Sequence, residues 1–358
     1  METEDLLVQL NATKPSELLL AQDQKQATQA MPADLRDSQD RDFDVGDTPG
    51  GVLFHMLIHL GYDIIFDTPL PLPFVTLLKV HVSRVKDLRL LDELRIHSAT
   101  NFECYVDSFG NTCCRFFAPA GQIRLSNSTL IYDTGEPDPV APWAREIPVQ
   151  HLPTEVLQYL LSSRYCEVDR MSNTAAELFG GIAPGWNRVQ AVCTWVHENV
   201  TFGYPFANPQ KTAFDVFRDR CGVCRDFQHL AVTMCRALNI PARYATGYLG
   251  DIGVPASAVP MDFSAWFEVY LEGRWWTFDA RHNQPRIGRV LMAVGRDASD
   301  VALTTSFGMA NLLQFRVTTE EVPEGEAYTP ERLKNFAFGP QACYSDSSLD
   351  LGAMRFSG

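Results

Sequence analysis

Cys224 is the residue of this sequence best placed to act as a nucleophile. It follows Gly222-Val223 and precedes a run whose apolar residues recur every three or four positions, as in a buried amphipathic helix: Phe227, Leu230, Ala231, Met234, Cys235 and Leu238. The thiol therefore lies at a predicted helix N-terminus, where free backbone N–H groups and the helix dipole favour a thiolate. We expect this position and the neighbouring Arg225 to lower the pKa of Cys224, and we expect Cys224 to alkylate faster than the other eight cysteines.

The segments after this helix carry two further candidate residues. Asn239 and Pro241 end the helix, and the next eight residues, ARYATGYL, are typical of a strand. Residues 261–271 and 275–280 then predict a hairpin with Glu272-Gly273 at its turn. Ser264 lies near the start of this hairpin and Asp279 near its end.

These segments resemble the bacterial transglutaminase-like cysteine enzymes, whose fold belongs with the papain-like thiol hydrolases and acyltransferases. The similarity covers about residues 155–322 and, more weakly, about residues 56–135. It implies a nucleophilic Cys at a helix start, a His in an H-A-W-x-E-V context and an Asp in a W-x-x-F-D context. Cys224 and Asp279 match this pattern, whereas Ser264 stands where the His is expected.

The serine at position 264 is the main departure from the family pattern. A His takes the thiol proton and an Asp holds the imidazole tautomer, and a hydroxyl cannot replace the His in this role. His229 and His282 are the candidate substitutes, although both are more typical of structural residues. Tyr204 could donate to an oxyanion beside Cys224, but packing in the core is its more common role.

Other arrangements of cysteine and histidine suggest different chemistry. Cys221-Gly-Val-Cys224 fits a redox motif or half of a zinc site, but no strand-before, cis-Pro-after context and no further ligands are evident. The adjacent Cys113-Cys114 pair predicts two packed thiols, and the spacing of His55 and His59 lacks additional ligands. We therefore expect no metal ion and no cofactor.

Composition limits the class of protein. With 358 residues and 46% hydrophobic content the chain can bury a sizeable core, and a net charge of -14 argues against a nucleic-acid partner. No apolar run reaches the roughly 18 residues that span a bilayer, so we expect no membrane partner. The acidic start lacks the basic region of a signal peptide, and an odd number of cysteines, nine, then predicts reduced thiols and a cytoplasmic location.

The pattern along the chain predicts an α+β protein with four parts. Residues 1–50 are rich in Gln, Asp and Ala and predict a mobile extension, and residues 51–145 predict a β-rich N-terminal domain. Residues 150–322 form the expected transglutaminase-like core, a helix bearing Cys224 packed on an antiparallel sheet, and residues 323–358 a tail.

Three functions are compatible with these residues. The first is cysteine-dependent acyl transfer through an acyl-enzyme on Cys224, in a transglutaminase-like acyltransferase or peptidase that acts on a peptide, protein or thioester. The second is a catalytically silent binding or scaffold protein, because position 264 is Ser. The third is amide formation from carrier-bound thioesters, with an amine acceptor or a carrier protein as partner. Thioesters have better leaving groups than amides, so a weakened triad would slow this reaction less.

Overall fold

The computed structural model describes residues 56–97, 101–257 and 261–322. The predicted N-terminal extension, the predicted tail and His55 lie outside these ranges. Within the described ranges, no helix combines the length and the apolar composition that crossing a bilayer requires.

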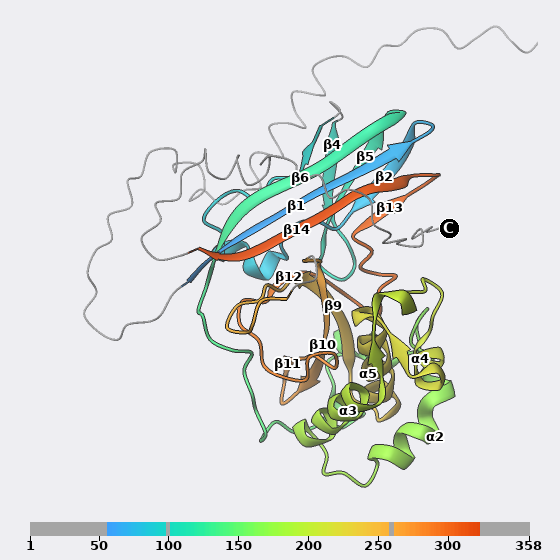
Figure 1. Ribbon diagram of the computed structural model, residues 1–358. Coiled ribbons are helices and arrows are strands. Elements are labelled where there is room, and N and C mark those ends of the chain that lie inside the picture. Colours follow the sequence, from blue (N-terminus) through green and yellow to red (C-terminus); the bar gives the residue numbers. More distant parts are fainter. Residues whose placement is uncertain (1–55, 98–100, 258–260, 323–358) are drawn as a thin grey trace, which may run out of the picture. The chain divides into compact units, whose positions relative to one another are not determined.

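Two four-stranded antiparallel sheets form the β-rich part of the chain (Figure 1). The first sheet has the order β14-β1-β6-β3 and the second the order β13-β2-β5-β4. Their buried apolar side chains form one cluster that includes Ile58, Phe74 and Leu125. The strands are β1 (Met56–Thr68), β2 (Leu72–Thr76), β3 (Arg95–Ile96), β4 (Phe102–Val106), β5 (Thr112–Ala118), β6 (Gly121–Asp133), β13 (Thr304–Ser306) and β14 (Asn311–Val322), and the 3-10 helix η2 (Val82–Asp87) lies between β2 and β3.

The last two strands of this part come from the far end of the described chain. β14 pairs with β1 along its length, from Leu57 opposite Val322 to Asp67 opposite Asn311, and β13 pairs with β2 (Figure 1). Residues 304–322 therefore complete the β-rich sheets, whereas from the sequence we expect them in the core. Periodicity predicted the strand at 313–322 but carries no information on its partner.

The core part places helices against a third antiparallel sheet of order β11-β10-β9-β12. Three helices, α2, α3 and α4, all contact a fourth, α5. The bounds are η3 (Val149–His151), η4 (Thr154–Leu160), α2 (Val168–Phe179), α3 (Trp186–Asn199), β7 (Thr201–Phe202), η5 (Tyr204–Phe206), α4 (Ala213–Asp219), β8 (Cys221–Gly222), α5 (Cys224–Ala237), β9 (Ala242–Tyr248), β10 (Ser264–Leu271), β11 (Arg274–Phe278) and β12 (Val290–Gly295). This arrangement confirms the predicted papain-like, transglutaminase-core fold.

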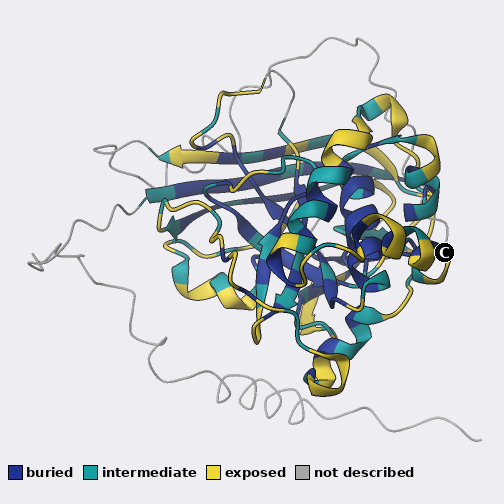
Figure 2. Cartoon of the chain, turned by 90° about the horizontal axis from the view of Figure 1, so that it is seen from below, coloured by how far each residue is buried: buried dark blue, intermediate teal, exposed yellow. Residues whose placement is uncertain are grey.

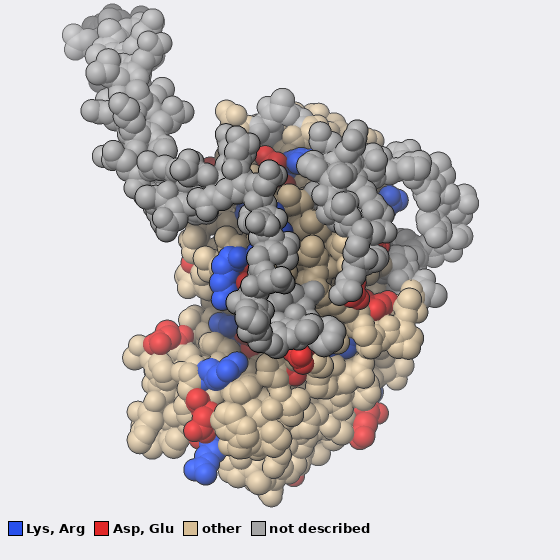
Figure 3. All heavy atoms as spheres, turned by 90° about the vertical axis from the view of Figure 1, so that its left-hand side faces the viewer, with Lys and Arg blue, Asp and Glu red and all other residues tan. Residues whose placement is uncertain are grey.

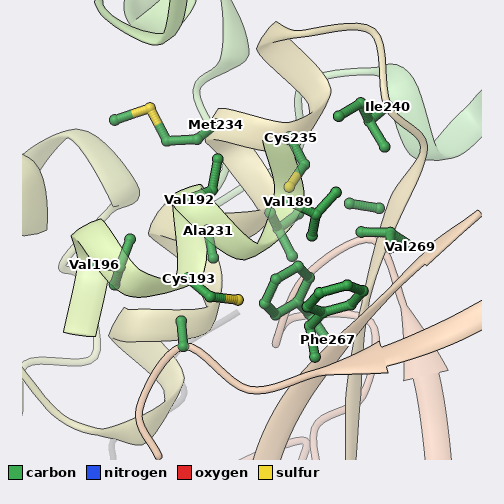
Figure 4. Packing of buried hydrophobic residues seen from close by; sticks show 14 of the residues in the cluster. Val189, Val192, Cys193, Val196, Ala231, Met234, Cys235, Ile240, Phe267 and Val269 are labelled. Atoms are coloured by element: carbon green, nitrogen blue, oxygen red, sulfur yellow. The ribbon is translucent and has the colours of Figure 1, made fainter. Parts of the chain in front are cut away.

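Helix α5 is the central element of the core. Every residue from Asp226 to Arg236 is buried, and Figure 2 shows dark blue helix and strands inside a rim of exposed segments. Its apolar side chains pack against α3 and β10, as the close-up of Ala231, Val192 and Phe267 shows (Figure 4). The helix ends where predicted, because Asn239 takes a positive φ of 63° that no helix continues through. The tertiary packing thus holds the N-terminus of α5 in a defined place.

The predicted hairpin is confirmed. Leu271 pairs with Arg274, and the two residues between them, Glu272 and Gly273, both have positive φ, of 49° and 81°. This is the type I′ geometry that matches the twist of two antiparallel strands. The turn fixes the register of β10 and β11, so it also fixes where Ser264 and Asp279 lie.

The expectation that all cysteines are reduced is wrong for one pair. Cys104 in β4 lies directly opposite Cys114 in β5, and the two form a disulfide. Cys113 points to the other face and stays a free, buried thiol. The hairpin register brings Cys104 and Cys114 together. The sequence did not predict this pairing, because the register cannot be read from it and the adjacent Cys113-Cys114 pair indicated two packed thiols.

We predict that Cys104→Ser lowers the free energy of unfolding by about 2–3 kcal/mol, because the disulfide closes a loop with a sequence separation of 10. Urea denaturation of the two proteins measures this difference. Adding a thiol reductant to the wild type should bring its midpoint to that of the variant. Equal midpoints without reductant would contradict the prediction.

Charged side chains are mixed in sign where they can be seen on one face of the described part. Figure 3 shows Lys and Arg side chains interspersed with Asp and Glu among uncharged residues. A protein that binds nucleic acid presents a continuous basic surface to the phosphates. This face does not have that character.

Candidate active site

Cys224 is the first residue of α5, as predicted. The Asp226 carboxylate accepts a hydrogen bond from the Val223 N–H at 2.9 Å and so takes up one of the free donors at the helix start. Cys224 itself is half-buried and packs with a small cluster that includes Tyr244 and Ala265. The nucleophile position thus lies where α5 meets strands β9 and β10.

The expected low pKa of Cys224 is not found. Burial raises the pKa of this thiol to about 11, and the negative charges of Asp262 and Asp226 act in the same direction. Arg281 and the backbone N–H of Arg225 oppose this shift without overcoming it. The helix dipole is outweighed because a carboxylate sits at the same helix terminus and because the sulfur loses water around it.

The Arg225 guanidinium, which we expected to activate the thiol, is engaged elsewhere. It contacts the Asp226 carboxylate at 3.1 Å and donates to the Asn208 carbonyl at 2.6 Å, and it stacks over the Tyr165 ring at 5.3 Å. The Asp226 carboxylate therefore compensates the positive charge of Arg225, which weakens the effect of this charge on the pKa of Cys224.

We predict a steep pH dependence for the alkylation of Cys224. A raised pKa means that the reactive thiolate is scarce at pH 7, so the rate with iodoacetamide should rise about tenfold per pH unit between pH 7 and pH 10. Asp262→Asn removes a negative charge and should raise the rate at pH 7. Mass spectrometry of tryptic peptides separates Cys224 from the other thiols. A rate that levels off below pH 8 would contradict this prediction.

Asp279 follows β11 and is the most heavily hydrogen-bonded side chain of the site. Its Oδ1 accepts from Gln228 Nε2 at 3.1 Å and from the backbone N–H groups of Arg281 and His282. Its Oδ2 accepts from His282 Nδ1 at 2.8 Å and from Arg289 Nη2 at 2.9 Å. Five donors thus surround a carboxylate that offers about four lone-pair sites.

These contacts keep Asp279 ionised. Burial would raise the pKa of its carboxyl, but the Arg289 guanidinium and the hydrogen bonds to His282 and Arg289 outweigh it and hold the pKa well below its usual range. Arg289 in turn pairs with Asp138 at 2.7 Å. Asp279 is therefore a buried carboxylate that stays ionised at neutral pH.

Gln228 is a residue of this site that sequence reasoning missed. Its Nε2 donates to Asp279 and to the Ala265 carbonyl, while its Oε1 accepts from the Ala280 N–H at 3.1 Å. Gln228 is fully buried and lies four residues after Cys224, one turn further along the same face of α5. This spacing of four residues from Cys224 is the sequence feature that could have indicated that Gln228 belongs to the site.

Ser264 begins β10 as expected and is buried, with 7% of its surface exposed. It pairs with Gly247 of β9, and its carbonyl accepts from Thr246 Oγ1 at 3.0 Å. Among the described residues, no hydrogen bond involves its hydroxyl, and none joins an imidazole to the Cys224 sulfur. The structure thus brings Cys224, β10 and Asp279 together around Gln228, but it places no imidazole on β10.

The two substitute histidines have different surroundings. His229 stacks on the Tyr165 ring at 4.9 Å, its Nε2 accepts from the Ala298 N–H, and burial lowers its pKa to about 3. It is a neutral packing residue. His282 instead binds the ionised Asp279 and keeps 22% of its side chain exposed.

Tyr204 lies in the electrostatic neighbourhood of Cys224. Burial raises the pKa of its hydroxyl, Asp262 and Cys224 add to this effect, and Arg281 opposes it. The Arg281 guanidinium stacks 3.9 Å above the Phe202 ring, which packs edge-on against Tyr204 at 5.5 Å. The role of Tyr204 as an oxyanion donor stays a prediction.

The other cysteine and histidine arrangements have structural partners. Cys221 and Cys224 are both free thiols, and the Lys211 ammonium contacts Cys221 Sγ at 3.7 Å. His59 is buried and contacts Ser128 Oγ at 2.8 Å. Among the residues that the structure describes, no group of three or more His, Cys, Asp or Glu is placed to hold a metal ion.

Comparisons with known proteins agree with the geometry. The model of the transglutaminase-like superfamily matches residues 172–280. The structure of a candidate cysteine protease from Cytophaga hutchinsonii is 30% identical, covers 77% of this chain and 93% of that chain, and has a TM-score of 0.65. An uncharacterised protein of Mycobacterium leprae is 23% identical over 230 residues, which are 62% of this chain and 81% of that protein.

Proposed function

Because this chain belongs to the transglutaminase-like superfamily, we propose that it is a cysteine-dependent acyl-transfer enzyme with Cys224 as nucleophile and Asp279 as the orienting carboxylate. One observation carries the proposal. Gln228, one turn after Cys224, hydrogen-bonds Asp279 and the backbone of β10 at the same time. Gln228 thereby ties the ionised Asp279 carboxylate to the helix that begins with the proposed nucleophile.

In this proposal Cys224 attacks the carbonyl carbon of an acyl donor and expels its leaving group. The acyl-enzyme is then resolved by water or by an amine. The backbone N–H of Cys224 at the start of α5, with the Tyr204 hydroxyl, would stabilise the oxyanion. The serine at position 264, where the family pattern has a His, favours donors whose leaving groups depart without a proton, such as thioesters, over unactivated peptide bonds.

This preference among acyl donors indicates a class of substrate and no individual compound. The resembling structure from Cytophaga hutchinsonii is described as a candidate cysteine protease, which supports a peptide or protein as acyl donor. A carrier-bound thioester, with an amine as acceptor, is the variant that tolerates a weak base best. The disulfide between Cys104 and Cys114 favours an oxidising compartment over the cytoplasm that we expected.

Acylation of Cys224 tests the proposal directly. The protein is incubated with p-nitrophenyl acetate or with an N-acetylcysteamine thioester, and the intact mass and the modified peptide are measured. We expect one acyl group on Cys224 and none in Cys224→Ala. No adduct from either donor, in a folded protein whose Cys224 still alkylates at pH 10, would contradict the proposal.

A catalytically silent binding protein is the second candidate. Ser264 at the expected position of the base and the raised pKa of the thiol favour it. In that case the absence of acylation at Cys224 would be accompanied by unchanged stability and ligand binding in Cys224→Ala.

A further inference from the structure

His282 is the one imidazole that the structure joins to the carboxylate of the proposed site. Its Nδ1 lies 2.8 Å from Asp279 Oδ2. Because Asp279 is ionised, Nδ1 carries the proton and donates it to this bond, which leaves the lone pair on Nε2. Within the described ranges, Nε2 has no hydrogen-bond partner, and the side chain stays 22% exposed. This is the tautomer that a general base requires.

The turn that carries His282 is hydrogen-bonded to α5 through Gln228. Gln228 holds this turn at two points, since its Nε2 donates to Asp279 and its Oε1 accepts from the Ala280 N–H. Residues four apart on a helix face the same way, so Gln228 and Cys224 share a face of α5. Arg281, the neighbour of His282 in the chain, acts electrostatically on the Cys224 thiol.

We propose that His282 is the proton acceptor for Cys224 and replaces the imidazole that position 264 lacks; this inference rests on the proposed function. As the sulfur bonds to the carbonyl carbon, the S–H proton passes to His282 Nε2. The imidazolium then returns this proton to the departing thiolate or amine. When water then hydrolyses the acyl-enzyme, His282 takes a proton from the attacking water and gives it to the Cys224 sulfur as the carboxylic acid product leaves.

The charged groups around His282 suit this role. Asp279 contacts the ring directly and stabilises the imidazolium that forms. Arg289 binds the same carboxylate oxygen and is itself balanced by Asp138, so the carboxylate is not fully neutralised. Arg281 precedes His282 in the chain and stacks on Phe202. His197, on α3, contacts only the Arg281 carbonyl of this turn, at 2.8 Å.

The test uses His282→Gln and measures the burst of p-nitrophenol from p-nitrophenyl acetate that depends on Cys224. We expect the acylation rate to fall at least about tenfold at pH 7, because a general base supplies a factor of about 10² when it acts well. His197→Gln is the matched control, since it removes an imidazole of α3 that contacts the backbone of the same turn; its rate should change less than about threefold. The pH–rate profile of His282→Gln should lose the imidazole ionisation and follow the thiol alone.

A second pair of variants separates a base from a structural residue. If His282 accepts the proton, it becomes redundant once position 264 carries an imidazole, so His282→Gln should alter the rate of a Ser264→His background less than about threefold. If His282 only holds Asp279 in place, its loss harms both backgrounds equally. His282→Ala adds a further check, because free imidazole should restore part of its rate.

The outcomes are distinct. A tenfold loss confined to the Ser264 background, with recovery by imidazole, supports the inference. An unchanged burst in His282→Gln, or equal losses in both backgrounds, overturns it and leaves the acyl-transfer function standing. A wild type that shows no burst dependent on Cys224 overturns the proposed function itself.

Discussion

Replacing Ser264 by histidine is expected to raise the rate of Cys224 acylation by p-nitrophenyl acetate or a simple thioester at least about 100-fold, the lower end of general-base effects. Ser264 begins β10, and the next residue, Ala265, packs in the same small cluster as Cys224. The family resemblance implies that an imidazole introduced here would face the thiol, with the ionised Asp279 as its orienting carboxylate. The substitution thus restores the histidine that the family pattern carries at this position.

Two variants serve as controls for this experiment. Ser264→Asn adds similar volume without a base, so it should leave the rate near that of the wild type. Adding Cys224→Ala to Ser264→His should abolish the gain, which assigns it to the thiol. An unchanged rate in a folded Ser264→His protein would show that position 264 does not face Cys224, and the assignment of β10 to the site would then fail.

Asp279→Ala is expected to lower the free energy of unfolding by about 3–5 kcal/mol, as the loss of one partner from a buried ion pair does. The substitution leaves the Arg289 guanidinium buried with one carboxylate, Asp138, in place of two. It also removes one of the two acceptors that the buried Gln228 Nε2 has. Urea denaturation measures the loss, and Asp169→Asn, at an exposed helix position, should change the stability by less than about 0.5 kcal/mol.

The contribution of Asp279 also has a definite pH dependence. Its pKa is depressed in the folded state, so its stabilising effect is fully present above the ordinary carboxyl pKa of about 4 and is lost as the pH falls below that value. The stability difference between wild type and Asp279→Asn should therefore shrink on acidification below about pH 4. A difference that is constant from pH 7 to pH 3 would contradict an ionised Asp279.

Local sequence determined the elements that have their own signals. The apolar period around Cys224 predicted α5, Asn239 predicted its end, and Glu272-Gly273 predicted the turn between β10 and β11. Each of these depends on contacts between residues close in the chain, or on a backbone conformation that few residue types adopt. The papain-like core as a whole was expected from the family resemblance of these segments and not from the local signals.

Tertiary structure alone decided which side chains meet. Cys104 faces Cys114 because of the hairpin register, and β14 returns to pair with β1, with Leu57 opposite Val322 and Asp67 opposite Asn311. The pKa of Cys224 rises because burial and Asp262 act on it from outside the helix whose dipole was considered alone. Asp279 binds Gln228, His282 and Arg289 because three segments converge on one carboxylate. Spacing along a chain cannot show such convergence, since these interactions depend on distance in space.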